Sequence, residues 1–302
     1  MTFRGAYARG VGVAVVTGSN SGIGRAAAVA LAVDGHTVAA TMRNPDKAAK
    51  LLAAAEVAGV RDRVHVVALD VGDDEAVRTG IAAIADAHGP VSVLVNNAGI
   101  APIGVLEETS IAVYAEAMEV NLYGAIRCTQ AVLPGMRAAG AGVIVNVSSV
   151  VGRFASLAQS PYVASKWALE GVSEGLAQEV APFGIRVVIV EPGVTRSAIF
   201  AKNTDAPNAS GAYEAHNRRM FQFYAVGIPQ ATPAEEVGAA IAAAVADPST
   251  PLRLTVAWGG PEIVAGRAAL GDDEWVAMGR LADDGAYYGA FLDAFGVDLR
   301  PR

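Results

Sequence analysis

A tyrosine and a lysine four residues apart have the types and spacing that most directly suggest chemistry in this chain. Tyr162 and Lys166 lie in an amphipathic stretch, so a helix projects both side chains from one face. A tyrosine ordinarily titrates near pH 10, but a nearby ammonium lowers the phenol pKa and suits the pair to moving a proton. Chance gives a Tyr-x-x-x-Lys spacing about 0.1 times in such a chain. We predict an acid–base pair here, against the alternative of an ordinary helix face.

The elements that must position this pair alternate between strands and helices. Apolar runs predict strands over residues 11–16, 37–41, 64–69, 91–95, 143–147, 187–190 and 252–257. Amphipathic stretches predict helices over residues 23–33, 73–88, 113–136, 163–180 and 234–246. We therefore expect an α/β fold, a doubly wound (Rossmann-type), mostly parallel seven-stranded sheet with helices on both faces. With 53% hydrophobic but only 6% aromatic residues, small aliphatic side chains must fill its core.

A glycine-rich turn joins the first predicted strand to the first helix. It reads Thr17-Gly18-Ser19-Asn20-Ser21-Gly22-Ile23-Gly24. Glycines at such a turn let the backbone approach a pyrophosphate, whose charge then meets the amides of the helix N-terminus. Alone, the turn is also compatible with an ordinary strand-to-helix connection. Its T-G-x-x-x-G-x-G spacing differs from the G-x-G-x-x-G fingerprint and resembles that of the short-chain dehydrogenase/reductase family.

Further segments over residues 11–260 resemble the same family, in matching order. The resemblance implies cofactor contacts from four places besides the pair Tyr162 and Lys166: the turn (Gly18, Ser19, Asn20, Ser21, Gly22, Ile23, Gly24), the adenine side (Asp70, Val71), the N-N-A-G motif beside the ribose (Asn97, Ala98, Gly99) and the carboxamide side (Pro192, Gly193, Thr195, Ser197). Asp70 alone also fits a capping residue. Ser197 stands where the family usually has threonine, so the choice between Thr195 and Ser197 stays open. Ser92 replaces a usual aspartate, a departure that bears on packing more than on chemistry.

The resemblance also implies a catalytic set of Asn121, Ser149, Tyr162 and Lys166. The family interval to the tyrosine assigns Ser149, whereas Ser148 is expected to face the scaffold; a serine that merely caps a turn is the alternative. Tyr162 then protonates the developing alkoxide while Ser149 orients it. Lys166 holds the nicotinamide ribose and lowers the Tyr162 pKa, and Asn121 holds a water beside the lysine. Asn121 also fits a buried polar residue that bends a long helix.

The end of the second predicted strand indicates which dinucleotide binds. It reads Thr41-Met42-Arg43-Asn44, and Met42 stands where a site for NAD normally has an acidic residue. The Arg43 guanidinium suits the 2′-phosphate of NADP. We predict NADP(H), with NAD(H) possible if Arg43 is merely a solvated arginine.

The predicted function is a hydride-transferring carbonyl reductase for an apolar ketone or aldehyde, or the reverse with a secondary alcohol. Residues 197–230 form the expected substrate loop, with the aromatics Phe200, Tyr213, Phe221, Phe223 and Tyr224. These rings would also serve simply to cover the sheet edge. One alternative is an NAD(H)-dependent alcohol or hydroxysteroid dehydrogenase, and another is a non-catalytic NADP-binding sensor or scaffold, for which the catalytic set would have little use.

Residues 1–260 are expected to form one dinucleotide-binding catalytic domain, which residues 261–302 extend. This C-terminal tail carries Trp275, Tyr287, Tyr288, Phe291 and Phe295 at partly helical spacing, which predicts one or two helices. The family resemblance implies a homodimer or homotetramer assembled through the helices over residues 113–136 and 163–180.

Composition excludes several other classes of protein. A net charge of −7 gives no general attraction to nucleic acid. No apolar stretch reaches the roughly 20 residues that span a bilayer, so we expect no membrane partner. Cys128 is the only cysteine, which rules out an intrachain disulfide, and the four histidines are scattered, so we expect no metal site. These features predict a cytoplasmic protein, and the family resemblance implies a small carbonyl or alcohol as its substrate.

Overall fold

The structure is a computed structural model that describes residues 12–197, 199 and 206–301. Two predicted features lie outside the described residues: Val11, where the first strand was expected to begin, and Phe200 of the expected substrate loop.

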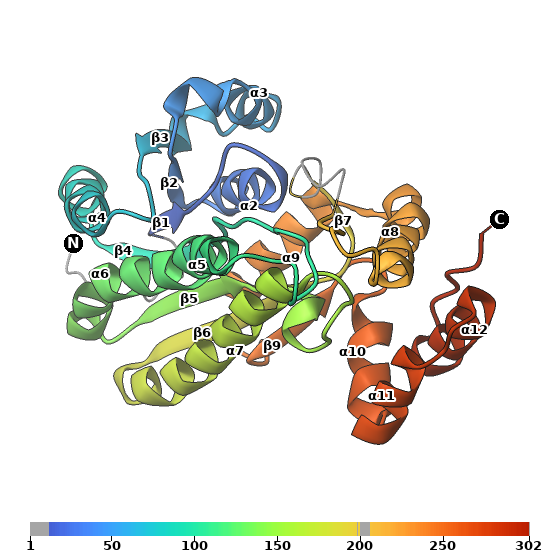
Figure 1. Cartoon of the computed structure of the whole chain (residues 1–302). Helices are drawn as coiled ribbons and strands as arrows, with labels where there is room; N and C mark the ends of the chain where they lie inside the picture. The colour runs from blue at the N-terminus through green and yellow to red at the C-terminus, as the bar shows by residue number, and fades with distance from the viewer. Residues whose placement is uncertain (1–11, 198, 200–205, 302) are drawn as a thin grey trace.

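A seven-stranded sheet forms the centre of the molecule (Figure 1). All its neighbouring strands are parallel, in the order β3-β2-β1-β4-β5-β6-β9. The strands are β1 (Val13–Val16), β2 (Thr37–Met42), β3 (Val64–Ala68), β4 (Val91–Asn96), β5 (Gly142–Val147), β6 (Ile185–Pro192) and β9 (Arg253–Val256). The predicted Rossmann-type α/β fold is confirmed. Its order reverses between β1 and β4, and ligands bind at the carboxyl ends of the strands at such a switch point.

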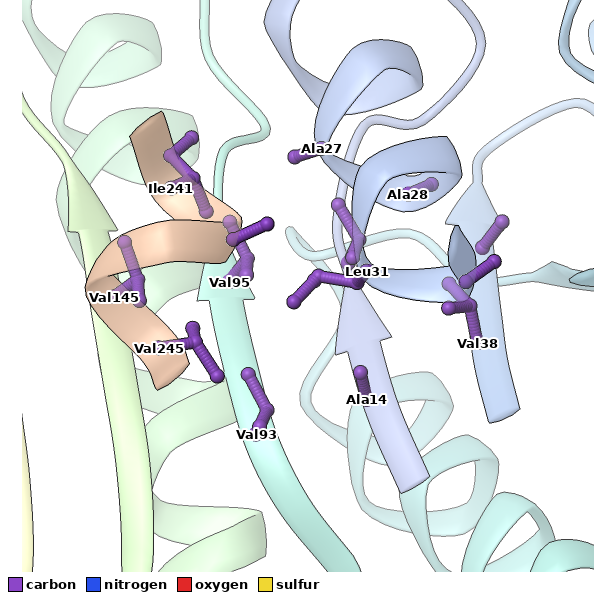
Figure 2. Packing of buried hydrophobic residues seen from close by; sticks show 14 of the residues in the cluster. Ala14, Ala27, Ala28, Leu31, Val38, Val93, Val95, Val145, Ile241 and Val245 are labelled. Carbon is purple, nitrogen blue, oxygen red and sulfur yellow. The ribbon is translucent and has the colours of Figure 1, made fainter. Parts of the chain in front are cut away.

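Helices cover both faces of the sheet. One face packs against α2 (Gly22–Val33), α3 (Ala49–Val57) and α9 (Ala234–Ala246), and the other against α4 (Asp74–His88), α6 (Gly124–Ala139) and α7 (Ser160–Val180). Helix α3 was not predicted from the sequence. On the first face, α2 and α9 lie side by side over β1, β4 and β5 (Figure 2). A Cβ on Gly238 of α9 would lie 2.7 Å from that of Ala26 in α2, so these helices approach closely only because both residues are small.

The expected helix over residues 113–136 is divided in the structure, so that prediction was wrong in detail. Helix α5 (Ile111–Met118) passes into a π-helical turn at Glu119–Tyr123, and α6 follows. The π turn contains Asn121, whose side chain bonds to a neighbouring loop instead of facing solvent. Such turns often occur at functional sites.

The expected substrate loop and tail contain more helix than was predicted. Residues 197–230 include helix α8 (Glu214–Gly227), which is flanked by a short parallel pair, β7 (Thr195–Arg196) and β8 (Thr232–Pro233). The tail forms three helices instead of one or two: α10 (Gly260–Ala269), α11 (Asp272–Gly279) and α12 (Asp284–Phe295). The breaks follow local caps, because Gly271 opens α11 and the Asp283 carboxylate accepts a hydrogen bond from the Ala286 amide at the start of α12.

Candidate active site

The glycine-rich turn forms a cradle that fits a pyrophosphate. Gly18 and Gly22 have φ angles of 68° and 52°, which favour glycine. A Cβ on Gly24 would lie 2.5 Å from the Gly18 carbonyl oxygen. Helix α2 has neither a side-chain cap nor an acidic residue in its first turn. Its N-terminal amides and positive dipole end are therefore available to an anion.

Thr17 joins this turn to the N-N-A-G segment. Its Oγ1 accepts hydrogen bonds from the Asn97 and Ala98 amides, both at 3.0 Å, and Thr17 is 1% exposed. The Asn97 side chain donates in return to the carbonyls of Thr17 and Gly18, at 2.9 and 3.2 Å. Thr17 carried no prediction. The side-chain amide of Asn97, a predicted cofactor residue, stabilises the turn.

Ser19 also holds the turn in place. Its Oγ donates to the Val16 carbonyl at 2.7 Å and its backbone amide to Thr41 at 3.0 Å. Both donors of Ser19 are therefore already engaged within the protein. The Thr41 bond ties the turn to the end of β2, and Arg43 follows there with an exposed side chain. Asn20 and Ser21 remain partly exposed in the turn.

The other predicted cofactor segments also lie at the carboxyl ends of their strands. The Asp70 carboxylate accepts a hydrogen bond from the Gly72 amide at 3.0 Å in an Asx-turn, whereas the helix cap of α4 is Asp73. Val71 is buried, and a Cβ on Gly124 would lie 2.7 Å from its side chain. A Cβ on Gly18 would lie 2.9 Å from the Ala98 Cα. The small residues Gly18 and Ala98 therefore allow the glycine-rich turn and the N-N-A-G segment to lie in contact.

Tyr162, Ser149 and Lys166 come together beneath these segments. Tyr162 and Lys166 are each 4% exposed on α7, and Ser149 is 8% exposed just after β5. The side chains of Tyr162 and Ser149 line the same pocket, and the Ser149 hydroxyl acts to lower the pKa of Tyr162. The Lys166 Nζ lies 5.8 Å from the centre of the Tyr162 ring and donates to the Val147 carbonyl at 2.8 Å. The predicted interval therefore brings Ser149, and not Ser148, to the tyrosine.

Burial sets the protonation of this pair. It raises the pKa of Tyr162 to about 12, and the Ser149 hydrogen bond offsets only part of that rise. Burial likewise lowers the pKa of Lys166 to about 8, while the Glu170 carboxylate acts to raise it. The expected lowering of the Tyr162 pKa is therefore not found in this structure, because desolvation of the phenolate is the largest effect.

Asn121 connects this site to the N-N-A-G segment. Its Oδ1 accepts from the Ile100 amide and its Nδ2 donates to the Ile100 carbonyl, both at 2.8 Å. The same Nδ2 donates at 2.8 Å to Ser165, whose hydroxyl donates to the Tyr162 carbonyl. A Cβ on Gly99 would lie 3.1 Å from the Asn121 Oδ1. Asn121 thus fixes the loop after β4 against the start of α7.

The segment after β6 crosses the mouth of the site. Thr195 is 6% exposed and its hydroxyl donates to the Gly193 carbonyl at 3.3 Å. Ser197 is half-buried. A Cβ added to Gly22 would lie 3.0 Å from the Cβ of Ser197. Pro192 and Gly193 line the pocket described next. Of Thr195 and Ser197, it is Ser197 that lies against the glycine-rich turn.

A narrow pocket of about 20 Å³ lies against Ser149 and Tyr162. Phe154, Gln159, Phe223 and Tyr224 also line it. A larger hollow of about 310 Å³ beside Trp258 and Val297 is lined by none of the predicted site residues. The narrow pocket is therefore the one that adjoins the predicted catalytic residues Ser149 and Tyr162.

Two further residues at this site carried no prediction. Glu170 is one helical turn beyond Lys166, 5% exposed, and bonded to Arg253 at 3.1 Å. Gln159 is fully buried one turn before Tyr162. The helical spacing that identified Lys166 also points to Glu170, whereas Gln159 has no sequence signal.

Among the described residues, no group of three or more His, Cys, Asp or Glu side chains is arranged to hold a metal ion. No helix in the same part of the chain is long and apolar enough to cross a membrane.

Comparison with known proteins matches this architecture. A family model described as short chain dehydrogenase matches residues 12–208. The uncharacterized oxidoreductase YusZ of Bacillus subtilis is 39% identical over 215 residues, covering 70% of this chain and 76% of that protein.

Two solved structures are also similar. A short-chain dehydrogenase from Streptomyces avermitilis has a TM-score of 0.76 at 38% identity, covering 90% of this chain and 98% of that one. A metagenomic short-chain oxidoreductase, solved in complex with NADP, has a TM-score of 0.65 at 28% identity, covering 81% and 96%. The chain therefore belongs to the short-chain dehydrogenase/reductase family and is an NAD(P)-dependent oxidoreductase acting on CH–OH groups.

Proposed function

We propose that this protein is an NADP(H)-dependent carbonyl reductase for apolar ketones or aldehydes. The observation that carries the proposal is that Tyr162 and Ser149 line one pocket at the end of β5, with the buried Lys166 Nζ 5.8 Å from the Tyr162 ring. This arrangement offers two hydroxyl donors to one carbonyl oxygen, which stabilises the charge that develops on that oxygen.

The protonation of Tyr162 favours the direction of reduction. When bound, the nicotinamide supplies a hydride. With its pKa raised to about 12, the Tyr162 phenol keeps its proton at neutral pH and gives it to the developing alkoxide. Ser149 donates to the same oxygen and orients it. Lys166, still mostly charged at pH 7, would hold the nicotinamide ribose, and Asn121 keeps the neighbouring loop in register.

The cofactor contacts follow from the cradle. The amides of Gly22, Ile23 and Gly24 would meet the pyrophosphate, with Ser197 facing them across the turn. Arg43 would pair with the 2′-phosphate, because it is exposed where the turn is tied to β2. The metagenomic relative solved with NADP supports the same preference.

The C-terminal extension helps to shape the pocket, and we propose that it is part of the catalytic domain. Phe154 lines the pocket and makes edge contacts with Trp275, Phe291 and Phe295 of the extension. Phe223 of α8 contacts Phe291 in turn. An apolar wall built in this way favours an apolar substrate.

Assembly and location remain predictions. The family resemblance supports a homodimer or homotetramer formed through α6 and α7, and Trp167 of α7 is 50% exposed. A cytoplasmic location is the expectation from sequence.

The test is NADPH oxidation followed against a panel of ketones, aldehydes and quinones, with Tyr162→Phe as control. We expect oxidation that depends on a carbonyl compound in the wild type and its loss in the variant. If no compound in the panel is reduced with either NADPH or NADH, the proposed function is overturned.

A further inference from the structure

A buried glutamine at the substrate pocket has half of its amide unpaired. Gln159 is 0% exposed, and its Nε2 donates to the Tyr224 hydroxyl at 2.7 Å. Its Oε1 has no hydrogen-bond partner among the residues that the structure describes. Buried polar atoms in folded proteins are nearly always paired. A donor for this oxygen must then come from whatever occupies the pocket.

The unpaired oxygen belongs to the pocket in which the reaction takes place. Gln159, Ser149 and Tyr162 line the same narrow space. Gln159 precedes the first residue of α7 and lies one helical turn before Tyr162. Because these three side chains line one pocket of only about 20 Å³, a ligand whose oxygen meets Tyr162 presents to Gln159 a group one or two carbons away.

Contacts with Gly104 and Tyr224 hold the backbone around Gln159 and its side-chain amide in position. The Gly104 amide donates to the Ala158 carbonyl at 2.7 Å, and the Ser160 amide donates to the Gly104 carbonyl at 3.2 Å. Ala158 itself has a φ of 52°, a conformation that costs free energy in a residue with a side chain. The Tyr224 hydroxyl holds the amide nitrogen from α8. Gln159 is thus positioned before a ligand arrives.

The pocket lining is uncharged over the residues that the structure describes. Val150, Val151, Phe154, Val194 and Phe223 supply its apolar surface, and no Asp, Glu, Lys or Arg of the described residues lines it. A charged group would lose its hydration here without gaining a partner of opposite charge. The pocket chemistry therefore favours a neutral group that donates a hydrogen bond.

We propose that Gln159 is a specificity residue that accepts a hydrogen bond from a second hydroxyl of the substrate. The preferred substrates are uncharged hydroxy ketones with an apolar substituent, the hydroxyl lying one or two carbons from the carbonyl. In the reverse direction the corresponding diols are oxidised. The inference rests on the proposed reductase function and names the substrate class of that site.

Two ketones of similar size test the inference. 2-Hydroxyacetophenone carries the donor, and 2-fluoroacetophenone replaces it with an electron-withdrawing atom that donates no hydrogen bond. The quantity measured is the ratio of kcat/KM for the hydroxy over the fluoro compound. Comparing this ratio between the wild type and Gln159→Leu cancels the different intrinsic reactivities of the two ketones.

We expect the ratio to fall about tenfold or more in Gln159→Leu, because the hydroxyl loses its buried acceptor. Gln159→Glu keeps an acceptor and is expected to retain a ratio closer to that of the wild type. The thermal midpoint and NADPH affinity of each variant show whether the fold is intact. A ratio that agrees within about twofold between wild type and Gln159→Leu overturns the inference while leaving the reductase function standing.

A binding measurement separates the inference from the proposed function. If neither ketone is reduced, thermal shifts with 1-phenyl-1,2-ethanediol and 1-phenylethanol are compared in the presence of NADP. A larger shift from the diol that is lost in Gln159→Leu supports the glutamine contact. Equal shifts from the two alcohols overturn it.

Discussion

We expect the hydroxyl of Thr17 to make a large contribution to the free energy of unfolding. Thr17→Val keeps the shape of the side chain but removes the acceptor for the Asn97 and Ala98 amides, both at 3.0 Å. A buried donor left unpaired costs about 1–3 kcal/mol, and the lower half of that range applies because both amides are only partly buried. Two such losses predict a decrease of about 2–4 kcal/mol in the free energy of unfolding.

This decrease is large beside a typical total of about 5–15 kcal/mol. Urea denaturation measures it, with Thr17→Ser as the matched control. The serine variant keeps the hydroxyl and loses one methyl group, which predicts a loss of about 0.5–1.5 kcal/mol. The valine variant is also expected to bind NADPH more weakly, because two of the hydrogen bonds that join the turn to the N-N-A-G segment are lost. A valine variant as stable as the serine variant would refute the reasoning.

Two predictions concern protonation and cofactor choice. The kcat/KM for ketone reduction is expected to fall as the pH rises through about 8, where buried Lys166 loses its charge. In Glu170→Gln the fall should move to lower pH, because a carboxylate that favours the charged lysine is gone; an unshifted profile counts against this role. Arg43→Ala is expected to weaken NADP binding about 10- to 100-fold and to change NAD binding by less than about twofold, measured by thermal shift. Greater stabilisation of the wild type by NAD than by NADP would overturn the assignment of Arg43.

The sheet and the approach of Tyr162 to Lys166 could be predicted because their signals are local. Buried parallel strands appear as short apolar runs such as Val13–Val16. The four-residue spacing of Tyr162 and Lys166 places both on one helix face, whatever surrounds them. The glycine-rich turn is equally local, since Gly18 and Gly24 are required by the backbone of their own segment and its neighbour.

What the sequence did not predict depends on tertiary contacts. The π turn at Asn121 is associated with bonds to Ile100, which is 21 residues away. The raised pKa of Tyr162 results from burial in a pocket walled by Phe223 and Tyr224 of α8, a segment expected to be a loop. The unpaired oxygen of Gln159 likewise appears only once the neighbouring elements are in place.

Transfer of an isotope label tests the reductase mechanism most directly. NADPH deuterated at the transferable position of the nicotinamide is incubated with the ketone that the wild type reduces fastest, and the alcohol is analysed by mass spectrometry. We predict one deuterium on the carbinol carbon, and in Tyr162→Phe a rate lower by about 10²- to 10⁴-fold with NADPH affinity nearly unchanged. Unlabelled alcohol, or equal rates in the two proteins, would contradict the roles assigned to the nicotinamide and to Tyr162.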